Sequence, residues 1–218
     1  MDSKSLKREF SAQKVRKDYG RVAWFYNFWG SITESKATGW LLEHAGLTGS
    51  LQILDIGTGT GKMLKQIAVR NKDGENVGID LSPDMLKRAE KKLSKTGCTY
   101  ELQEGSAYNL PFEDNRFDRV FICFMIDLLP EKDFDILLKE FKRVLKNGGL
   151  LLVSYMTFGR SRTTRFWDWV AKKFPRLMTD CRPVNLPPYI QNAGFEIIKD
   201  AYIVQNTFPA GVVVAQKK

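Results

Sequence analysis

Apolar and polar residues follow two alternating periodicities along most of the chain. Short, mainly apolar runs of strand length occupy residues 51–55, 76–80, 118–124 and 150–155, and a further short strand is predicted at 99–103. Longer segments with apolar residues three and four positions apart lie between or beside them, at 61–70, 83–94 and 131–145. Strands separated by helices predict a parallel sheet with helices on both faces. Two last apolar runs, 195–204 and 207–216, predict an antiparallel pair at the edge of that sheet.

The segments at either end of this pattern have a different character. Residues 1–20 are basic, 21–30 are dense in aromatic side chains, and 33–46 have the spacing of an amphipathic helix that stops at Gly46. Residues 157–188 combine arginines, aromatic residues and prolines, which predicts an inserted helix and loop. A short helix, 187–193, should follow and end at Gly194.

Charge adds one feature to this organisation. The 218 residues include 34 basic and 25 acidic side chains, a formal charge of +9, and the basic excess gathers near residues 4–21 and 160–182. Such clusters attract anionic membrane surfaces, phosphates or nucleic acid, or they serve only as a solvated face. The sequence contains no apolar run of about 18 residues, so it predicts no membrane-spanning helix. The polar N-terminus lacks the apolar core of a signal peptide. We expect a cytoplasmic protein.

Cysteine and histidine narrow the possible chemistry. Cys98, Cys123 and Cys181 are widely spaced and form no metal-ligand pair or disulfide framework. His44 is the single histidine, and it falls on the predicted helix 33–46. A histidine-based metal site or a Ser/His/Asp triad therefore lacks its residues, and we predict no metal.

The most informative segment is the glycine-rich turn after the first strand. Gly57, Gly59 and Gly61 stand at every second position after Asp55. A dinucleotide fingerprint has its third glycine one position later, and a Walker A loop has four residues between its glycines. Asp80 ends the second strand, where a carboxylate accepts hydrogen bonds from both hydroxyls of an unphosphorylated ribose. Asp55 beside the turn suits a cationic ligand.

Four motifs in the expected order resemble those of class I S-adenosylmethionine-dependent methyltransferases. They are the glycine turn 55–61, the ribose-binding segment 78–86, the "LPF" segment 109–118 and the "RVLK-x-GG" segment 141–149, with Asn147 in place of the usual proline. Within that family the chain looks most like the ubiquinone/menaquinone-biosynthesis C-methyltransferases and phospholipid N-methyltransferases. Residues 19–27 resemble their entry segment. The resemblance implies a Rossmann-like, seven-stranded, mostly parallel sheet with a C-terminal antiparallel strand.

The same resemblance implies S-adenosyl-L-methionine as cofactor and assigns the residues that bind it. Adenine should lie near Ser106 and Ala107, although relatives often carry an acid where this chain has Ser106. The methionine part should touch the backbone of Cys123 and Phe124 at the end of the fourth strand. The full expected set is Tyr19, Asp55, Gly57, Thr58, Gly59, Gly61, Asp80, Leu81, Met85, Ser106, Ala107, Cys123 and Phe124.

Three further side chains are candidates for catalysis, and each has an alternative role. Asp127 follows the fourth strand; it could accept a proton or steady a cationic amine near the transferred methyl, or it could cap the helix near 131. Tyr26 and Tyr155 could close over the site, although aromatic residues are more commonly core residues. Methyl transfer needs mainly alignment and exclusion of water, so the lack of an obvious base does not argue against an enzyme.

The expected organisation is one methyltransferase domain over 1–218. Residues 1–46 form an arm and lid, 50–156 the cofactor-binding core, 157–188 an insertion over the acceptor site, and 189–218 the last strands. We expect a small-molecule or lipid-like acceptor, by analogy a quinone precursor or phospholipid amine, with membrane contact through the basic arm. The alternatives are RNA or protein methylation, although no appended nucleic-acid module is recognised, and a non-catalytic cofactor-binding protein.

Overall fold

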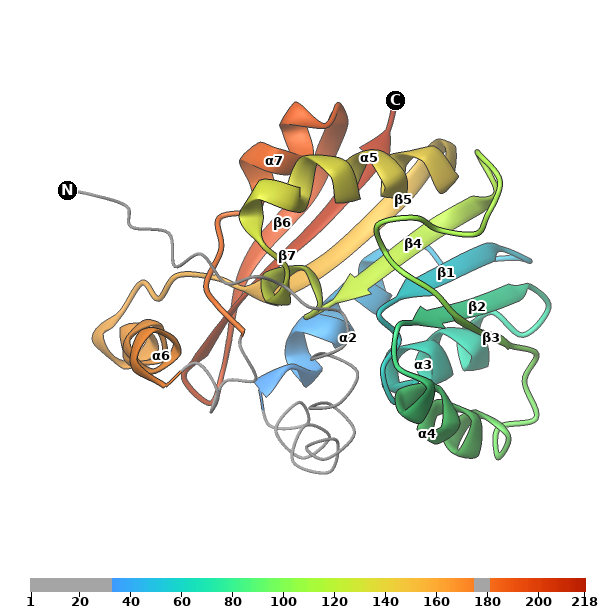
Figure 1. The fold of residues 1–218 in the computed structure, drawn as a ribbon, viewed down its shortest axis with the longest axis horizontal. Coiled ribbons are helices and arrows are strands. Elements are labelled where there is room, and N and C mark those ends of the chain that lie inside the picture. The colour runs from blue at the N-terminus through green and yellow to red at the C-terminus, as the bar shows by residue number, and fades with distance from the viewer. Residues whose placement is uncertain (1–32, 175–180) are drawn as a thin grey trace.

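The computed structural model describes residues 33–174 and 181–218. Within these residues the chain forms a seven-stranded sheet in the order β3-β2-β1-β4-β5-β7-β6 (Figure 1). Parallel pairing joins β1 to β2 and β4, β2 to β3, and β4 to β5, whereas β7 runs antiparallel to both β5 and β6. The predicted α/β, mostly parallel sheet with an antiparallel C-terminal strand is confirmed.

The bounds of the elements follow the predicted rhythm closely. In chain order the strands and α-helices are α2 (Ser35–His44), β1 (Gln52–Ile56), α3 (Lys62–Arg70), β2 (Glu75–Asp80), α4 (Pro83–Leu93), β3 (Glu101–Glu104), β4 (Phe117–Cys123), α5 (Phe134–Val144), β5 (Leu145–Met156), α6 (Arg162–Lys173), α7 (Pro187–Asn192), β6 (Phe195–Gln205) and β7 (Phe208–Lys217).

Two boundaries differ from the sequence-based expectation by more than two residues. The segment predicted as one helix over 131–145 is a 3₁₀ turn, Glu131–Asp133, followed by α5. Strand β5 begins at Leu145 rather than at residue 150, because Leu145 pairs with Phe117 before the register shifts ahead of Arg119. Neither irregularity has a signature in the hydrophobic pattern.

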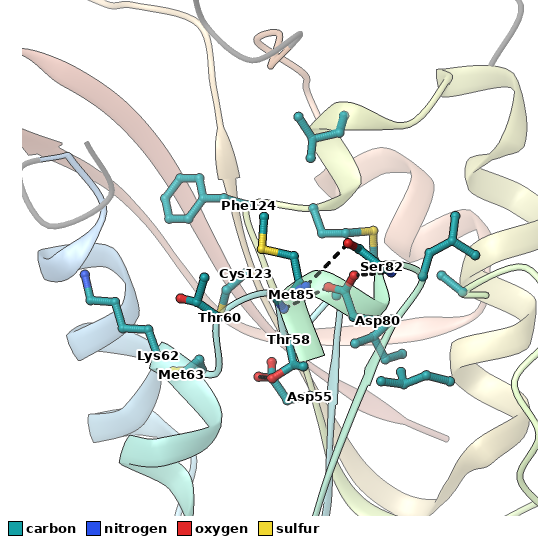
Figure 2. Close-up of a pocket in the computed structure, with 18 of the residues that line it drawn as sticks. Asp55, Thr58, Thr60, Lys62, Met63, Asp80, Ser82, Met85, Cys123 and Phe124 are labelled. Carbon is teal, nitrogen blue, oxygen red and sulfur yellow. Dashed lines mark hydrogen bonds between the residues drawn. The ribbon is translucent and has the colours of Figure 1, made fainter. Parts of the chain in front are cut away.

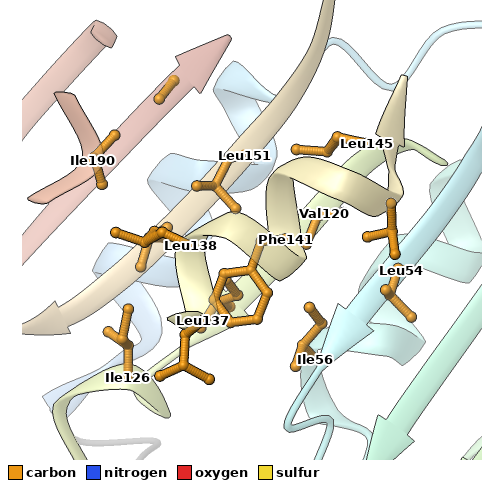
Figure 3. Packing of buried hydrophobic residues seen from close by; sticks show 14 of the residues in the cluster. Leu54, Ile56, Val120, Ile126, Leu137, Leu138, Phe141, Leu145, Leu151 and Ile190 are labelled. Carbon is orange, nitrogen blue, oxygen red and sulfur yellow. The ribbon is translucent and has the colours of Figure 1, made fainter. Parts of the chain in front are cut away.

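Alternating side chains of the central strands divide the core into two layers. In β1, Ile53 packs with α2 and α3 on one face, whereas Leu54 and Ile56 pack under α5 on the other. Figure 3 shows Phe141 and Leu137 of α5 lying over this second face. Strands buried on both faces are apolar at consecutive positions, which explains the short continuous runs in the sequence.

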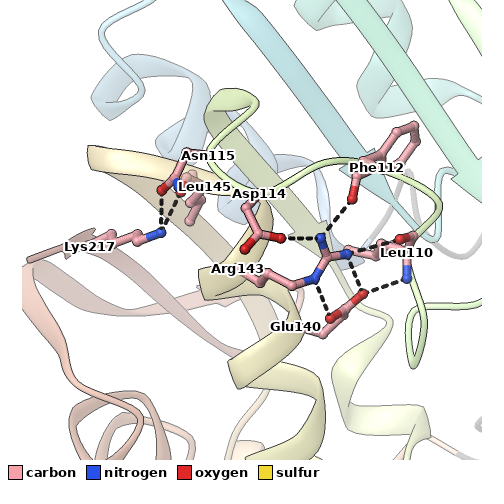
Figure 4. Close-up of polar contacts among 8 residues, drawn as sticks. All are labelled: Leu110, Phe112, Asp114, Asn115, Glu140, Arg143, Leu145 and Lys217. Carbon is pink, nitrogen blue, oxygen red and sulfur yellow. Dashed lines mark hydrogen bonds and ion pairs between the residues drawn. The ribbon is translucent and has the colours of Figure 1, made fainter.

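Arg143 of α5 fixes the loop that follows β3. Its guanidinium donates to the carbonyl oxygens of Phe112 (2.7 Å) and Leu110 (3.0 Å), and it pairs with Asp114 (2.7 Å) and Glu140 (2.7 Å) (Figure 4). Hydrogen bonds to a charged donor are among the stronger ones in proteins. The "LPF" and "RVLK" segments therefore form one structural unit, and this unit holds the loop that follows β3 in place.

Across the described residues, no helix is both long and apolar enough to cross a membrane.

Candidate functional site

A cavity of about 200 Å³ opens at the carboxyl ends of β1, β2 and β4. The crevice at these strand ends is where open α/β sheets bind ligands. Figure 2 shows side chains from α3, the β2–α4 junction and the end of β4 facing this space. Its walls combine the glycine turn with apolar side chains, among them Ile79, Met85, Met125 and Leu129.

The glycine turn is tied to the neighbouring strand by backbone hydrogen bonds. The amides of Gly57 and Thr58 both donate to the carbonyl of Ile79, at 2.8 and 3.0 Å. Gly57 has a φ of +70°, and a side chain there would place its Cβ 2.6 Å from Cγ of Met125. The turn therefore needs glycine for its backbone conformation and for its closeness to the cavity wall.

Gly61 serves a different purpose from the glycines that precede it. It adopts a φ of +72° at the N-cap of α3, and a Cβ there would lie 2.9 Å from Cβ of Ala89. It does not line the cavity, whereas Gly57 and Gly59 do. Its role is the close packing of α3 against α4, which keeps the glycine turn against the sheet.

Asp80 occupies the tip of β2 and connects the two loops of the site. One carboxylate oxygen accepts from the amide of Gly59 (2.8 Å), and the other accepts from the amide of Ser82 (2.9 Å). A carboxylate has about four acceptor positions, so each oxygen can accept a second hydrogen bond from a ligand. Burial raises the pKa of Asp80, although the backbone amides oppose that rise.

Asp55 lies at the base of the cavity and is 1% exposed. One oxygen accepts from the hydroxyl of Thr58 at 2.7 Å. Burial, together with repulsion from Asp80, raises the pKa of Asp55 to about 7. A carboxyl that is costly to ionise alone becomes a favourable partner when a cation enters beside it.

Glu34, directly before α2, adds a third carboxyl to the cavity lining. Burial and repulsion from Asp127 raise its pKa to about 8, whereas Lys62 lowers it. Among the described residues that line the cavity, Lys62 is the one basic side chain against these three carboxyls. The electrostatic character of the site therefore favours a cationic ligand and opposes a diphosphate.

The other side of the cavity comes from the starts of α4 and of the loop after β3. Ser82 caps α4 by accepting from the amide of Met85 (3.4 Å), with Pro83 in the first turn. The hydroxyl of Ser106 accepts from the amide of Tyr108 (3.2 Å), and Ser106 and Ala107 both line the space. Leu81 completes this wall.

The end of β4 supplies Cys123 and Phe124. Phe124 has a φ of +49°, a left-handed conformation that is rare and strained for a bulky residue. Such strain concentrates at functional sites. Burial raises the pKa of the Cys123 thiol well above its ordinary value, so this sulfur stays protonated and is not a nucleophile.

Of the expected cofactor-binding residues that the structure describes, all but Gly61 line the cavity. Tyr19 and Tyr26 lie outside the described residues. Tyr155 is 4% exposed and packs in the core under α5, opposite Gly211 of β7, so it does not reach the cavity. Among the two roles considered for this tyrosine, core packing matches its position.

Asp127 lies neither at the cavity, as a catalytic role would need, nor at the cap of the helix near residue 131. It does not line the cavity, and the turn at Glu131–Asp133 has no side-chain cap. Instead one oxygen accepts from the amide of Met156 (2.7 Å) and from the thiol of Cys181 (2.9 Å). The other oxygen is buried and has no hydrogen-bond partner among the described residues, and burial raises the pKa of this carboxyl.

Several residues that line the cavity lie outside the motifs recognised in the sequence. Glu34 and Thr38 come from the helix before the sheet, Lys62 and Gln66 from one face of α3, and Met125 and Leu128 from the turn after β4. The position of Lys62 beside the glycine turn is the one local hint. The others reach the cavity only through tertiary packing, which residue spacing does not reveal.

The residues that line the cavity suit S-adenosylmethionine in charge and in polarity. Asp80 can accept from sugar hydroxyls, and the carboxyls of Asp55 and Glu34 suit a ligand with sulfonium and ammonium groups. At Gly59 a Cβ would have no atom nearer than 3.9 Å, so the turn leaves open space for a ligand. Apolar walls suit an adenine ring and a methionine chain.

Comparison with known proteins agrees with this geometry. A family described as "Methyltransferase domain" matches residues 53–149. The chain is 39% identical over 107 residues to the ubiquinone/menaquinone biosynthesis C-methyltransferase UbiE of Syntrophotalea carbinolica, covering 49% of this chain and 44% of that protein. It is 38% identical over 102 residues to the demethylmenaquinone methyltransferase of Thermus thermophilus, covering 47% and 46%. These matches span less than half of each relative's length.

Solved structures show the same fold at low sequence identity. The [4+2]-cyclase SpnF superimposes with a TM-score of 0.76 and 19% identity, covering 98% of both chains. Magnesium protoporphyrin IX methyltransferase from Synechocystis, solved with S-adenosylhomocysteine bound, gives a TM-score of 0.67 and 14% identity over 97% of this chain and 90% of that one. Residues 53–149 therefore match a methyltransferase domain, and the described residues have the fold of these solved structures.

Proposed function

We propose that this protein transfers a methyl group from S-adenosylmethionine to a small, largely apolar acceptor of the quinone-precursor class. The observation that carries the proposal is the carboxylate of Asp80 beside the glycine turn, inside the segment that matches a methyltransferase domain. Relatives named as demethylmenaquinone methyltransferases support the acceptor class. A phospholipid amine is the second acceptor that the apolar walls allow.

In this proposal the chain's own residues mainly bind, orient and exclude water. Asp80 accepts from the ribose hydroxyls, Ser106 and Ala107 flank the adenine, and the backbone of Cys123 lies beside the methionine part. When bound, the cofactor supplies an electrophilic methyl group on a sulfonium. Apolar side chains such as Met125 and Leu128 keep water from the methyl group and give an apolar acceptor its surface.

The experiment is transfer of tritium from labelled S-adenosylmethionine to a panel of acceptors. The panel holds a short-chain prenylated naphthoquinol, phosphatidylethanolamine vesicles, total RNA and a protein extract. The proposal expects label in the naphthoquinol. Label in RNA or protein instead would overturn it, and label in phosphatidylethanolamine would keep methyl transfer but replace the acceptor class.

A result without any methyl transfer would also be informative, because the [4+2]-cyclase SpnF shares this fold. If S-adenosylhomocysteine binds with micromolar affinity and no acceptor in the panel takes label, the chain is a cofactor-binding protein without methyltransferase activity towards these acceptors. A binding measurement on the same preparation therefore accompanies every transfer assay.

Cofactor affinity should depend on pH through the buried carboxyls. The pKa of Asp55 is raised to about 7 and that of Glu34 to about 8, so in the ligand-free protein both hold protons that a bound cation displaces. We expect the Kd for S-adenosylmethionine to fall up to about tenfold for Asp55 alone as the pH rises from 6 to 8. Isothermal titration calorimetry should show proton release on binding. The Asp55→Asn variant should lose the part of the pH dependence of Kd that comes from Asp55. An unchanged pH dependence in that variant would contradict the role assigned to this carboxyl.

The same raised pKa values predict how the stability of the ligand-free protein changes with pH. Both carboxyls bind protons more tightly in the folded than in the unfolded state, so their contribution to stability is full at low pH. The contribution begins to fall once the pH exceeds about 4, where the same carboxyls ionise in the unfolded chain, and it is lost completely when the pH has risen through about 7 for Asp55 and about 8 for Glu34.

For Asp127 we propose a structural role, holding the end of β5 next to the segment that contains Cys181. Asp127→Asn keeps an oxygen for the amide of Met156, so turnover should stay within about threefold of wild type. Asp127→Ala leaves that buried amide unpaired and should lower the free energy of unfolding by about 1–3 kcal/mol in urea titrations. A large loss of turnover in Asp127→Asn at unchanged stability would instead favour a catalytic role.

A further inference from the structure

Helix α6 has one face that packs on the molecule and an opposite face with an unusual composition. Thr164, Val170 and Ala171 are buried on the inner face. The outer face follows helical spacing from Arg162 through residues 165, 166, 169 and 173, and these five positions are Arg, Arg, Phe, Trp and Lys. The face is thus made of aromatic and basic side chains alone.

The aromatic residues of this face are strongly exposed. Phe166 is 52% exposed and Trp169 50%, and their rings stack at a centroid distance of 5.9 Å. Phe174 extends the patch at 52% exposure, with its ring 5.7 Å from that of Trp169. A contiguous exposed aromatic patch marks an interaction surface, because water contact with it is unfavourable.

The charges around the patch have one sign and no internal partner. Arg162, Arg165, Lys172 and Lys173 are exposed, and none forms an ion pair within the part of the chain that the structure describes. The acid of this helix, Asp168, points to the side and accepts from the amide of Gly159 at 3.1 Å. The complementary partner of such a face is anionic and apolar at once.

The inner face of α6 reaches towards the ligand cavity through two ring contacts. Trp167 donates to the hydroxyl of Thr207 (3.0 Å) and packs edge-on against Phe208 at 5.8 Å between centroids. Phe208 in turn lies 6.3 Å from the ring of Phe124, which lines the cavity. Figure 1 shows α6 at one end of the molecule beside β7. The exposed face is therefore anchored to the wall of the proposed active site.

We propose that α6 is a membrane-docking helix, whose outer face lies in the headgroup region of an anionic lipid bilayer. Aromatic side chains enter the interface while arginine and lysine contact anionic headgroups, as in interfacial amphipathic helices. The inference deepens the proposed function, because an apolar acceptor resides in lipid and the helix that meets the lipid is connected to the cavity wall through Phe208 and Phe124. It assigns the surface to residues 162–174.

The test is flotation of the full chain with vesicles of phosphatidylcholine, with and without phosphatidylglycerol. Wild type should bind the anionic vesicles at least about tenfold more tightly, with binding weakened by added salt. Phe166→Ser with Trp169→Ser, and separately Lys172→Glu with Lys173→Glu, should each lower that affinity about tenfold or more.

Matched controls carry equal changes elsewhere on the surface. Ile136→Ser removes an apolar side chain that is 56% exposed on α5, and Lys91→Glu with Lys95→Glu reverses two exposed charges around the end of α4. Both should leave vesicle binding unchanged. If the α6 variants float as well as wild type, or the controls lose binding equally, the proposal is overturned.

Other occupants of the face have distinct outcomes that also overturn the proposal. A homodimer in sedimentation velocity that Phe166→Ser with Trp169→Ser converts to monomer would make the face a contact between copies. Tighter binding to homopolymer RNA than to vesicles, lost in the same variants, would make it a nucleic-acid surface.

The docking proposal and the methyltransferase proposal can fail separately. The α6 variants should keep wild-type affinity for S-adenosylhomocysteine and wild-type turnover on a water-soluble acceptor, and should lose turnover only on acceptor held in anionic vesicles. Vesicle binding without any methyl transfer refutes the function alone. Transfer to soluble acceptor without vesicle binding refutes the docking alone.

Discussion

Replacing Asp80 with asparagine is expected to weaken S-adenosylhomocysteine binding about 100-fold, which corresponds to about 2.7 kcal/mol. The carboxylate then no longer offers charged acceptors to the two ribose hydroxyls, and each hydrogen bond to a charged group contributes about 1.5–3 kcal/mol. The amide oxygen can still accept from either Gly59 or Ser82, so the fold should persist. Isothermal titration calorimetry measures the affinity, and the circular dichroism melting curve monitors the fold.

A ligand lacking both ribose hydroxyls separates sugar binding from support of the loop. It should bind wild type and Asp80→Asn about equally, because the interaction removed by the variant is already absent. Asp84→Asn, an exposed acid in the first turn of α4, is the matched control and should bind as wild type does. Equal losses for both ligands in Asp80→Asn would show that the carboxylate supports only the glycine turn.

Gly61→Ala is expected to lower the free energy of unfolding by about 3 kcal/mol. A left-handed φ costs a non-glycine residue about 1–2 kcal/mol, and the new Cβ lies 2.9 Å from Cβ and 3.1 Å from Cα of Ala89. Forcing a methyl group into such a contact costs about 1–3 kcal/mol more. Urea unfolding measures the loss.

Gly97→Ala provides the control for strain without crowding. Its φ of +68° is close to that of Gly61, yet a Cβ there has nothing within 4 Å. We expect it to lose only about 1–2 kcal/mol. Adding Ala89→Gly to Gly61→Ala should recover part of the loss. If Gly61→Ala and Gly97→Ala were equally destabilised, close packing of α3 on α4 would not be the reason for this glycine.

Much of the site was predictable because its parts are local. Asp55, the glycines and Asp80 each stand at the end of a strand whose apolar run is visible in the sequence. Parallel strands bring their carboxyl ends to one edge, so the strand order alone gathers these residues. The motif around Arg143 was recognisable too, although its hydrogen bonds to the carbonyl groups of Leu110 and Phe112 were not.

The other features of the site depend on contacts between residues far apart in the chain, and the spacing of residues in the sequence does not reveal such contacts. Asp127 accepts from the amide of Met156 and the thiol of Cys181, which are distant in the chain. Tyr155 is the penultimate residue of β5, and a shift of one residue along a strand decides on which face of the sheet a side chain lies. Glu34 enters the cavity because α2 packs across the sheet. These positions follow from tertiary packing, so sequence motifs could not reveal them.

The most direct test of the account is a crystal structure of the protein with S-adenosylhomocysteine. We expect the nucleoside in the cavity at the ends of β1, β2 and β4, with both sugar hydroxyls on the carboxylate of Asp80 and the adenine beside Ala107. A nucleoside bound elsewhere, or one in this cavity whose sugar does not contact Asp80, would contradict it.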